Sequence, residues 1–265
     1  MNTAATPLTY INEISRRSAR RYNSRMIPWL DRTDPFPPVT AALADPDGLL
    51  AAGGGLELPR LLDAYRRGIF PWYGAGQPVL WWTPDPRTVL FPREFRISRS
   101  LRKALRHRDY EIRVDTRFET VMRACATPRG AGDTGAAGTW IDDAMIAAYG
   151  ALHGQGFAHS VETWINDELA GGLYGVALGR VFYGESMFAR TPDASKIALA
   201  HLARQLERWE FGLIDCQVRT AHLLSLGARE IRRSDFMRRL AELVNYADRT
   251  GRWRFDDDLR DDLTE

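Results

Sequence analysis

Residues 159–188 constrain the fold more than any other part of the chain. Short runs rich in β-branched, aromatic and other apolar residues predict strands at 159–164, 169–178 and 181–188. Turn residues at Asn166–Asp167 and Gly179–Arg180 separate these runs, and such tight turns join neighbouring strands. The segment therefore predicts three consecutive strands of one sheet.

The elements around this segment follow a definite order. From Tyr110 onward the pattern predicts β-α-α-β-β-β-α-β-α-β, and the helix over 194–209 has an apolar face. The remaining predicted elements are strands at 110–114, 211–215 and 230–232, and helices at 117–126, 141–152, 220–226 and 234–245. This order is expected of an N-acyltransferase domain of the acetyltransferase type, in which a mixed sheet splays after its fourth strand and the acyl donor lies in the opening. The predicted fold class is α+β.

The first third of the chain is rich in prolines and glycines. Residues 1–40 begin with an Arg-rich stretch and end in a proline cluster, which predicts an extension or arm. Near-helical spacing of apolar residues predicts a helix within 56–69. The aromatic and proline-rich segment 70–87 predicts a packed loop surface.

Composition excludes several classes of protein. The chain has 265 residues, 45% of them hydrophobic, which is ample for a core and excludes a disordered or fibrous protein. No run approaches the roughly 18 apolar residues of a membrane span, so we expect no integral membrane protein. The N-terminus lacks a basic-then-apolar signal peptide, and we expect a cytoplasmic location. Cys125 and Cys216 are too few for a zinc site built from CxxC pairs or for a disulfide framework.

Charge is balanced overall but segregated along the chain. The formal net charge is +2, yet residues 93–108 carry seven basic side chains against one acid, and residues 256–265 are strongly acidic. Such segregation indicates a local contact with a polyanion.

Two nucleotide-binding motifs can be weighed directly. Gly130, Gly132 and Gly135 match GxGxxG as a string, but a predicted helix precedes them where a dinucleotide site needs a strand, so a flexible loop is the better interpretation. The R/QxxGxG/A loop that holds the coenzyme A pyrophosphate is absent from its expected position. Residues 184–190 stand there, and Glu185 would oppose phosphates. The acyl donor is therefore predicted not to be coenzyme A.

Longer ordered motifs, covering most of the chain from Pro46 to Leu240, resemble the leucyl/phenylalanyl-tRNA–protein transferase family. They are FPWY (70–73), LWWTPDPR (80–87), ISRSLRK (97–103), TWI (139–141), AHSVE (158–162), GGLYGVALGRVFYGESMFAR (171–190), ASKIAL (194–199), LIDCQ (213–217) and SLGA (225–228).

The resemblance implies a fold, a reaction and partners. The fold would be a small N-terminal domain (41–92) followed by an acetyltransferase-like catalytic domain (93–250), with a partly flexible extension (1–40) and an acidic tail (251–265). The reaction would move Leu, Phe or Met from aminoacyl-tRNA to the N-terminal Arg or Lys of an acceptor protein, marking it for degradation by the N-end rule. We expect a monomer that needs no metal or diffusible cofactor. The extension, the tail and the Gly-rich insertion 130–138 depart from the family pattern.

Three residues are predicted to carry the chemistry. Asp215 and Gln217 flank Cys216 at the end of a predicted buried strand, and strand alternation puts both on one face. Because the nucleophile must be a neutral α-amine, Asp215 could orient the ammonium and receive its proton directly or by relay, and Gln217 could position the ester carbonyl. A buried structural pair is the alternative. Glu185 could contact an amino group of donor or acceptor, or form an ordinary surface ion pair.

Two further sets complete the predicted site. An aminoacyl pocket would be lined by Leu173, Met187, Leu199, Leu202 and Ile214, although each one taken alone fits ordinary core packing. The resemblance makes Trp72 and Trp140 contacts to the 3′-terminal adenosine of tRNA, with core packing as the alternative. A basic stripe at helical spacing would follow tRNA phosphates, or be only a solvated face; it comprises Arg99, Arg102, Lys103 and Arg106.

Two other functions stay open on the residues alone. A coenzyme A-dependent small-molecule N-acetyltransferase is disfavoured by the missing pyrophosphate loop. A non-catalytic tRNA-binding module would use the stripe at 93–108 but would not require Asp215, Gln217 and Glu185 to converge.

Overall fold

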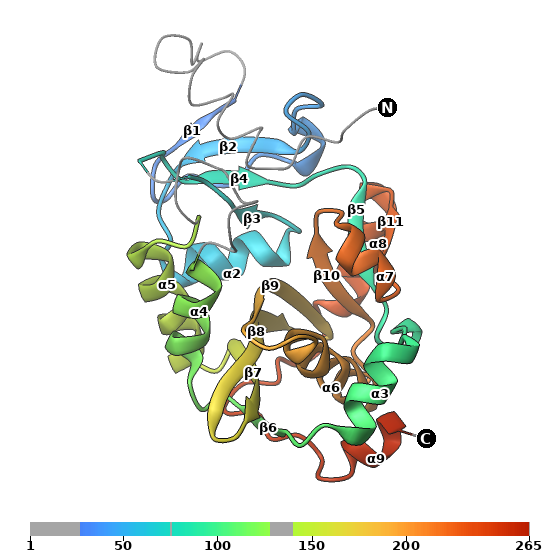
Figure 1. The fold of residues 1–265 in the computed structure, drawn as a ribbon. Helices are drawn as coiled ribbons and strands as arrows, with labels where there is room; N and C mark the ends of the chain where they lie inside the picture. The colour runs from blue at the N-terminus through green and yellow to red at the C-terminus, as the bar shows by residue number, and fades with distance from the viewer. Residues whose placement is uncertain (1–26, 75, 128–139, 265) are drawn as a thin grey trace, which may run out of the picture. The chain divides into compact units, whose positions relative to one another are not determined.

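The computed structural model describes residues 27–74, 76–127 and 140–264, drawn as a ribbon in Figure 1. The chain divides into two compact units: one is formed by residues up to 85 together with 126–145, and the other by 86–125 together with 146–265. The Gly-rich insertion 130–138 lies outside the described residues. Both units combine helices with sheets, so the predicted α+β class is confirmed.

A mixed seven-stranded sheet is the centre of the larger unit. Its strands, in spatial order, are β11 (Arg229–Ile231), β5 (Arg87–Leu90), β10 (Leu213–Gln217), β9 (Val181–Ala189), β8 (Glu168–Leu178), β7 (Ala158–Ile165) and β6 (Glu111–Val114). Every neighbouring pair is antiparallel except β9 and β10, which run parallel. The three consecutive strands predicted from 159–188 are β7, β8 and β9.

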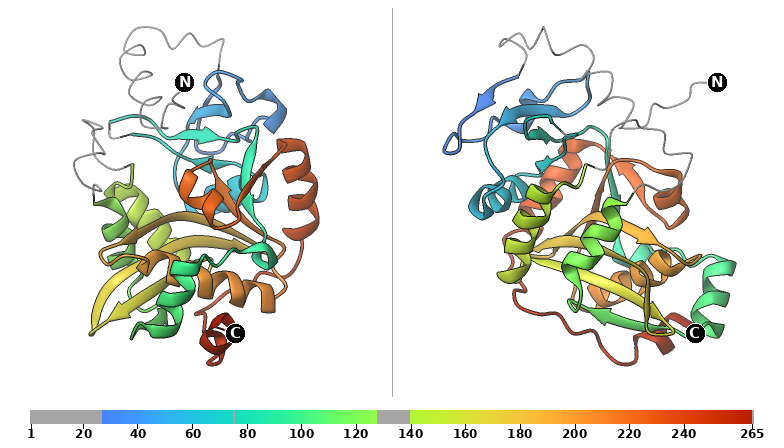
Figure 2. Two further views of the ribbon diagram at one scale, coloured as in Figure 1. Left: turned by 45° about the vertical axis from the view of Figure 1, so that its right-hand side comes forward. Right: turned by 60° about the vertical axis from the view of Figure 1, so that its left-hand side comes forward.

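Helices cover both faces of this sheet (Figure 2). Helix α6 (Ala194–Arg208) packs on β7, β8 and β9, and its apolar side chains join Leu173 of β8 in one hydrophobic core. Because side chains alternate along a strand, Tyr174 points to the opposite face. There its ring contacts Phe118 of α4 (Phe118–Ala126) and Tyr149 of α5 (Asp143–Gly154), each at 5.9 Å between centroids.

Four further helices complete the larger unit, together with a short 3-10 turn at Pro92–Glu94. They are α3 (Arg99–His107), α7 (Ala221–Ser225), α8 (Arg233–Leu243) and α9 (Leu259–Thr264). Ser98 caps α3 by accepting a hydrogen bond from the Leu101 N–H, as its residue type favours.

The smaller unit contains a second sheet that the sequence analysis did not predict. Its strands, in spatial order, are β1 (Trp29–Leu30), β2 (Leu49–Gly53), β4 (Leu80–Trp82) and β3 (Phe70–Pro71), accompanied by α2 (Leu58–Arg66) and a 3-10 turn at Val39–Ala41. Segment 70–87, predicted to be a loop surface, thus contains β3 and β4 and the first residue of β5. Residues 27–40 contribute β1 and a buried Phe36, whose ring lies edge-on to Trp81 at 4.8 Å.

Residues 251–264, predicted as an acidic tail, pack against the rest of the larger unit, to which they belong. Trp253 is buried, its ring stacks on His159 at 3.7 Å, and its backbone N–H donates to the buried Asp115 carboxylate at 2.9 Å. Arg208 of α6 forms ion pairs with Asp256, Asp258 and Asp262. The acidic charges are therefore partly neutralised within the fold.

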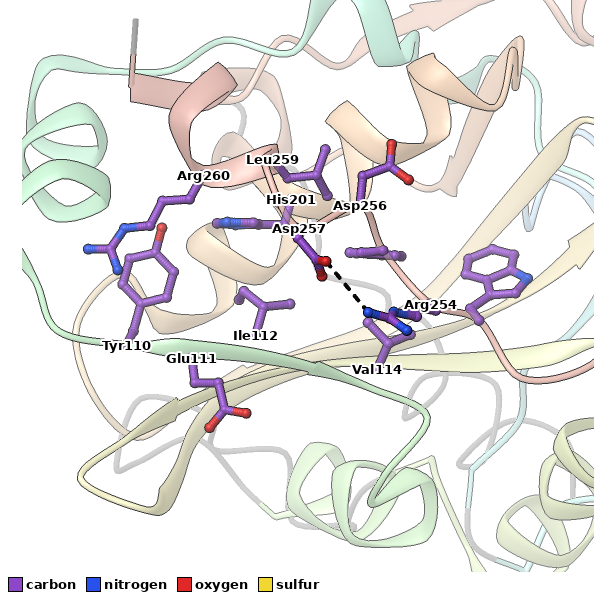
Figure 3. A pocket seen from close by; sticks show the side chains of 12 residues that line it. Tyr110, Glu111, Ile112, Val114, His201, Arg254, Asp256, Asp257, Leu259 and Arg260 are labelled. Atoms are coloured by element: carbon purple, nitrogen blue, oxygen red, sulfur yellow. Dashed lines mark ion pairs between the residues drawn. The ribbon is translucent and has the colours of Figure 1, made fainter.

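A cavity of about 440 Å³ lies under this C-terminal segment, as Figure 3 shows. Its lining includes Tyr110, His201 and Arg260, with the Arg260 guanidinium 4.4 Å from the Tyr110 ring centre. Burial lowers the pKa of His201 to about 4, so this imidazole is neutral at physiological pH. The lining shares no residue with the predicted site.

Candidate active site

The seven-stranded sheet opens where β9 and β10 separate. The two strands pair over three residues only, ending with Asp215 beside Tyr183. Beyond this point β9 continues to Ala189, paired with β8, while β10 ends at Gln217. The predicted catalytic residues Asp215, Gln217 and Glu185 all lie at this separation, so the structure brings them together.

Asp215 is held in a buried ion pair that the sequence analysis missed. Its carboxylate accepts two hydrogen bonds from the Arg87 guanidinium, Nε to Oδ1 at 2.8 Å and Nη2 to Oδ2 at 2.6 Å. The Gln217 N–H donates to Oδ1 at 3.0 Å. The side chains of Arg87 and Asp215 are 1% and 0% exposed. In this arrangement the Asp215 carboxylate has no direct access to a substrate. It can affect a bound substrate only through Arg87 and Gln217, which are hydrogen-bonded to it.

Gln217 does not continue the strand alternation that predicted its orientation. β10 bulges against β5 between Asp215 and Gln217, and Gln217 adopts a φ of 54°. A non-glycine residue in this region costs on the order of 1–3 kcal/mol and persists only where its surroundings impose it. With its amide nitrogen facing the carbonyls, the side chain donates to Gly184 O at 2.9 Å and to Cys216 O at 3.1 Å.

Glu185 occupies a bulge on β9. Tyr174 pairs with Ser186 and Gly175 pairs with Gly184, so Glu185 is the extra residue of β9 between these two pairs. Glycine suits position 175 at this bulge, because a Cβ there would lie 2.2 Å from Tyr183 O. The Glu185 side chain is half-buried and accepts a hydrogen bond from the Tyr149 hydroxyl at 3.1 Å.

Tyr149 is the second site neighbour that the sequence analysis missed. It is fully buried and lies edge-on to Tyr174. Burial and then the nearby Glu185 carboxylate raise the pKa of Tyr174 well above its ordinary value. The sequence did not mark Tyr149 as a neighbour of the site, because an aromatic residue on the buried face of a helix predicts only core packing.

Replacing Tyr149 by phenylalanine should remove one hydrogen bond from Glu185 while keeping the ring packing. A bond to a charged group contributes about 1.5–3 kcal/mol, so we expect kcat to fall by about 10- to 150-fold. The change in Tm should be smaller than the change that Tyr149→Ala gives. Steady-state kinetics and thermal unfolding of both variants would check this. An unchanged kcat in Tyr149→Phe would show that the bond does not position Glu185 for transfer.

Cys216, between Asp215 and Gln217, is not activated as a nucleophile. Burial and the adjacent Asp215 carboxylate raise the pKa of this thiol well above its ordinary value, and thiolate is the reactive form.

The predicted aminoacyl-pocket residues form one apolar cluster. Leu173, Leu199, Leu202 and Ile214 belong to the core between the sheet and α6, and Met187 packs against it half-buried. Leu173 and Met187 are cross-strand partners on β8 and β9. Four of the five are thus fully buried here, and Met187 is the member nearest to solvent.

The predicted tRNA contacts are divided between the two units. Trp72 and Trp140 belong to the smaller unit, where both are half-buried, and the Trp72 ring lies 5.8 Å from that of Trp82. In the larger unit Arg99, Lys103 and Arg106 are exposed on α3, and Arg102 is half-buried. Arg106 donates to the Thr264 carbonyl of α9 at 2.9 Å, so part of its hydrogen-bonding capacity is used within the fold.

Neither a metal site nor a membrane span is found among the described residues. Within 27–74, 76–127 and 140–264, no three His, Cys, Asp or Glu side chains gather closely enough to hold a metal ion. No helix in these ranges has the length and apolar character needed to cross a bilayer.

Comparison with known proteins decides the family. The family described as leucyl/phenylalanyl-tRNA protein transferase matches residues 89–241, and its N-terminal domain matches residues 54–85. The chain belongs to the leucyl/phenylalanyl-tRNA–protein transferase family. The resemblance inferred from the sequence motifs is confirmed.

Three relatives, each named leucyl/phenylalanyl-tRNA–protein transferase, illustrate how similar this transferase is to other family members. It is 63% identical to the protein of Nitrosospira multiformis over 87% of this chain and 98% of the relative. The protein of Nitrosomonas europaea is 62% identical over 87% of this chain and 96% of the relative. The protein of Thiobacillus denitrificans is 63% identical over 83% of this chain and 95% of the relative.

A solved structure of a functionally unknown conserved protein from Staphylococcus epidermidis matches at a TM-score of 0.36 and 10% identity. The match covers 69% of this chain and 68% of that one and is too distant to inform the fold.

Proposed function

We propose that this transferase moves Leu, Phe or Met from aminoacyl-tRNA to the N-terminal Arg or Lys of acceptor proteins and so marks them for N-end-rule degradation. The family membership supports this reaction. We also propose that the larger unit is an acetyltransferase-like domain, which the separation of the parallel strands β9 and β10 supports. The protein would act in the cytoplasm as a monomer.

The reaction requires one bond to form and one to break. The acceptor α-amine nitrogen attacks the ester carbonyl carbon, an amide bond forms, and the bond from that carbon to the ribose oxygen breaks. The amine loses a proton and the leaving ribose hydroxyl gains one. A carboxylate beside the amine can accept the first proton.

Glu185 is the candidate that carries this proposal. It is half-buried in a strand bulge, next to the carbonyl to which Gln217 is bonded, whereas Asp215 is enclosed by Arg87 and Gln217. Glu185 would therefore contact the α-ammonium of the acceptor, and Gln217 would position the ester. Met187, the least buried member of the apolar cluster, would admit the donor side chain, because a thioether chain adapts to several shapes.

A transfer assay tests the proposed function directly. Labelled Leu should pass from Leu-tRNA to a model protein that begins with Arg, and not to the same protein with its N-terminus acetylated. Absence of transfer, with acetyl-coenzyme A consumed instead, would contradict the proposal and favour an N-acetyltransferase.

Replacing Arg99 and Lys103 by alanine should weaken aminoacyl-tRNA binding. Both side chains are exposed on α3 and have no ion pair within the described ranges. If each neutralises one phosphate, the slope of log affinity against log salt should shrink by about 0.7–0.9 per contact. Salt titrations of tRNA affinity would measure this change.

A matched charge change provides the control for this measurement. Arg123 and Arg238 are also exposed on helices of the larger unit, but each is paired with an acid on its own helix. Their double alanine variant should leave the salt slope unchanged. If the slope of log affinity against log salt changes equally in both double variants, the loss of tRNA affinity follows from net charge alone. Phosphate contact along α3 would then be excluded.

A further inference from the structure

Arg87 is a fully buried cation next to the candidate active site, and it takes no part in the proton transfer proposed for Glu185. It begins β5, the strand between β10 and β11. A buried guanidinium is costly unless it is paired and hydrogen-bonded. Arg87 meets this requirement through its two-pronged contact with Asp215.

The site is built for arginine in particular. The guanidinium Cζ lies 4.6 Å from the centre of the buried Phe236 ring of α8, and the Nε and Nη2 groups face the two carboxylate oxygens. A lysine ammonium could supply the charge but neither the parallel pair of hydrogen bonds nor the flat stacking surface. The orientation of the Asp215 carboxylate therefore depends on the shape of the Arg87 side chain.

The Asp215 carboxylate also holds the turn that follows it. Its Oδ1 accepts one hydrogen bond from Arg87 Nε and another from the Gln217 backbone N–H. The turn is closed by Val218 N–H donating to Cys216 O at 2.7 Å, with Gln217 at its centre in the left-handed region. The Asp215 carboxylate thus holds the central residue of the turn by its backbone.

The turn centred on Gln217 sets the spacing of β9 and β10 beside Glu185. Backbone pairing of the two strands ends at Asp215 and Tyr183, and the next link across the opening is the Gln217 amide bonded to Gly184 O. Gly184 directly precedes Glu185 in the bulge. A continuous series of contacts therefore runs from Arg87 through Asp215 and Gln217 to the backbone that carries Glu185.

We propose that Arg87 is a positioning residue for aminoacyl transfer, which fixes the Gln217 turn through Asp215 and thereby places Glu185 and Gln217 at the reacting ester. This inference rests on the proposed function. It assigns Arg87 no contact with substrate; its effect is transmitted through Asp215.

The Arg87→Lys variant tests the proposal through the separate kinetic constants. Because small displacements of reacting groups are costly, we expect kcat to fall by about 10- to 100-fold. The KM for aminoacyl-tRNA should stay within about threefold of the wild-type value, since the proposed tRNA contacts lie on other elements.

Glu162→Gln is the matched control. The Glu162 carboxylate is as buried as that of Asp215, accepts hydrogen bonds from Thr116 and Arg117, and has no part in the proposed site. It should lower Tm while leaving kcat of the folded protein unchanged.

A double-mutant cycle with Gln217→Ala separates positioning from general destabilisation. If Arg87 acts through Gln217, then Arg87→Lys should lower kcat much less in the Gln217→Ala background than in the wild type. Fully additive losses, a wild-type kcat in folded Arg87→Lys, or an equal loss of kcat in Glu162→Gln would each overturn the proposal. All rates are compared with wild-type transfer from Leu-tRNA, so a wild type that transfers nothing would refute the proposed function before any variant is compared.

Discussion

Glu185→Gln should lower kcat for transfer by about 10²- to 10⁴-fold, the range typical of a lost general acid or base. Glutamine has nearly the same shape as glutamate and can still accept the hydrogen bond that Tyr149 donates at 3.1 Å. The substitution therefore removes the charge and the basicity while keeping the local contact. Single-turnover transfer from preformed Leu-tRNA would measure the chemical step apart from product release.

The control for this variant is a glutamate on the same sheet. Glu168 is exposed at the start of β8, outside the candidate site, and Glu168→Gln makes the same chemical change. It should keep wild-type kcat and KM. If Glu185→Gln transfers Leu as fast as Glu168→Gln does, Glu185 takes no proton in the reaction and our assignment of the base is wrong.

Trp253→Ala should be the most destabilising substitution in the C-terminal segment. The indole stacks on His159 and lies edge-on to Trp209 and Phe211, and it is 5% exposed. Truncating a buried tryptophan leaves a cavity and costs about 3–5 kcal/mol of unfolding free energy. Urea unfolding followed by circular dichroism would measure the loss as a lower midpoint.

Trp29→Ala provides the comparison for this loss. Trp29 is 66% exposed on β1 of the smaller unit, so its replacement should change stability by only about 0.5 kcal/mol. If both variants lose the same unfolding free energy, the packing of Trp253 contributes no more to stability than an exposed tryptophan does.

The elements that the sequence predicted well have strong local patterns. β7, β8 and β9 alternate within runs bounded by turn residues, and α6 has a continuous apolar stripe. Hydrophobic periodicity reports such elements because each buries one face against a single core. Each predicted bound from 110 to 245 lies within a few residues of the observed one.

The sheet of the smaller unit was missed because its strands are too short to show a period. β1 and β3 have two residues each, and β3 ends in Pro71. Proline suggests a turn or loop, and two residues cannot display an alternation. The pairing of β2 with β4 depends on contacts far apart in the sequence, which no local pattern reports.

The candidate site was predicted in part, for a related reason. Asp215 and Gln217 stood out because polar residues at the end of a buried strand are costly unless they are used, and Glu185 stood out through the family resemblance. Arg87 and Tyr149 did not, since arginine is most often a surface residue and tyrosine a common core residue. The positive φ at Gln217 and the bulge at Glu185 depend on the pairing of β10 and β9 with their neighbours, so simple alternation could not report either of them.

The contact between Trp253 and Asp115 has a consequence for biosynthesis. The two residues are 138 positions apart, and the Trp253 N–H fills one of the acceptor positions on the Asp115 carboxylate. During synthesis β6, β7 and α6 leave the ribosome before Trp253 does, so until residue 253 emerges the His159 ring lacks the stacking indole and Asp115 lacks one of its hydrogen-bond donors. The stacking and the hydrogen bond that Trp253 makes can therefore form only after the strands of the larger unit have been synthesised.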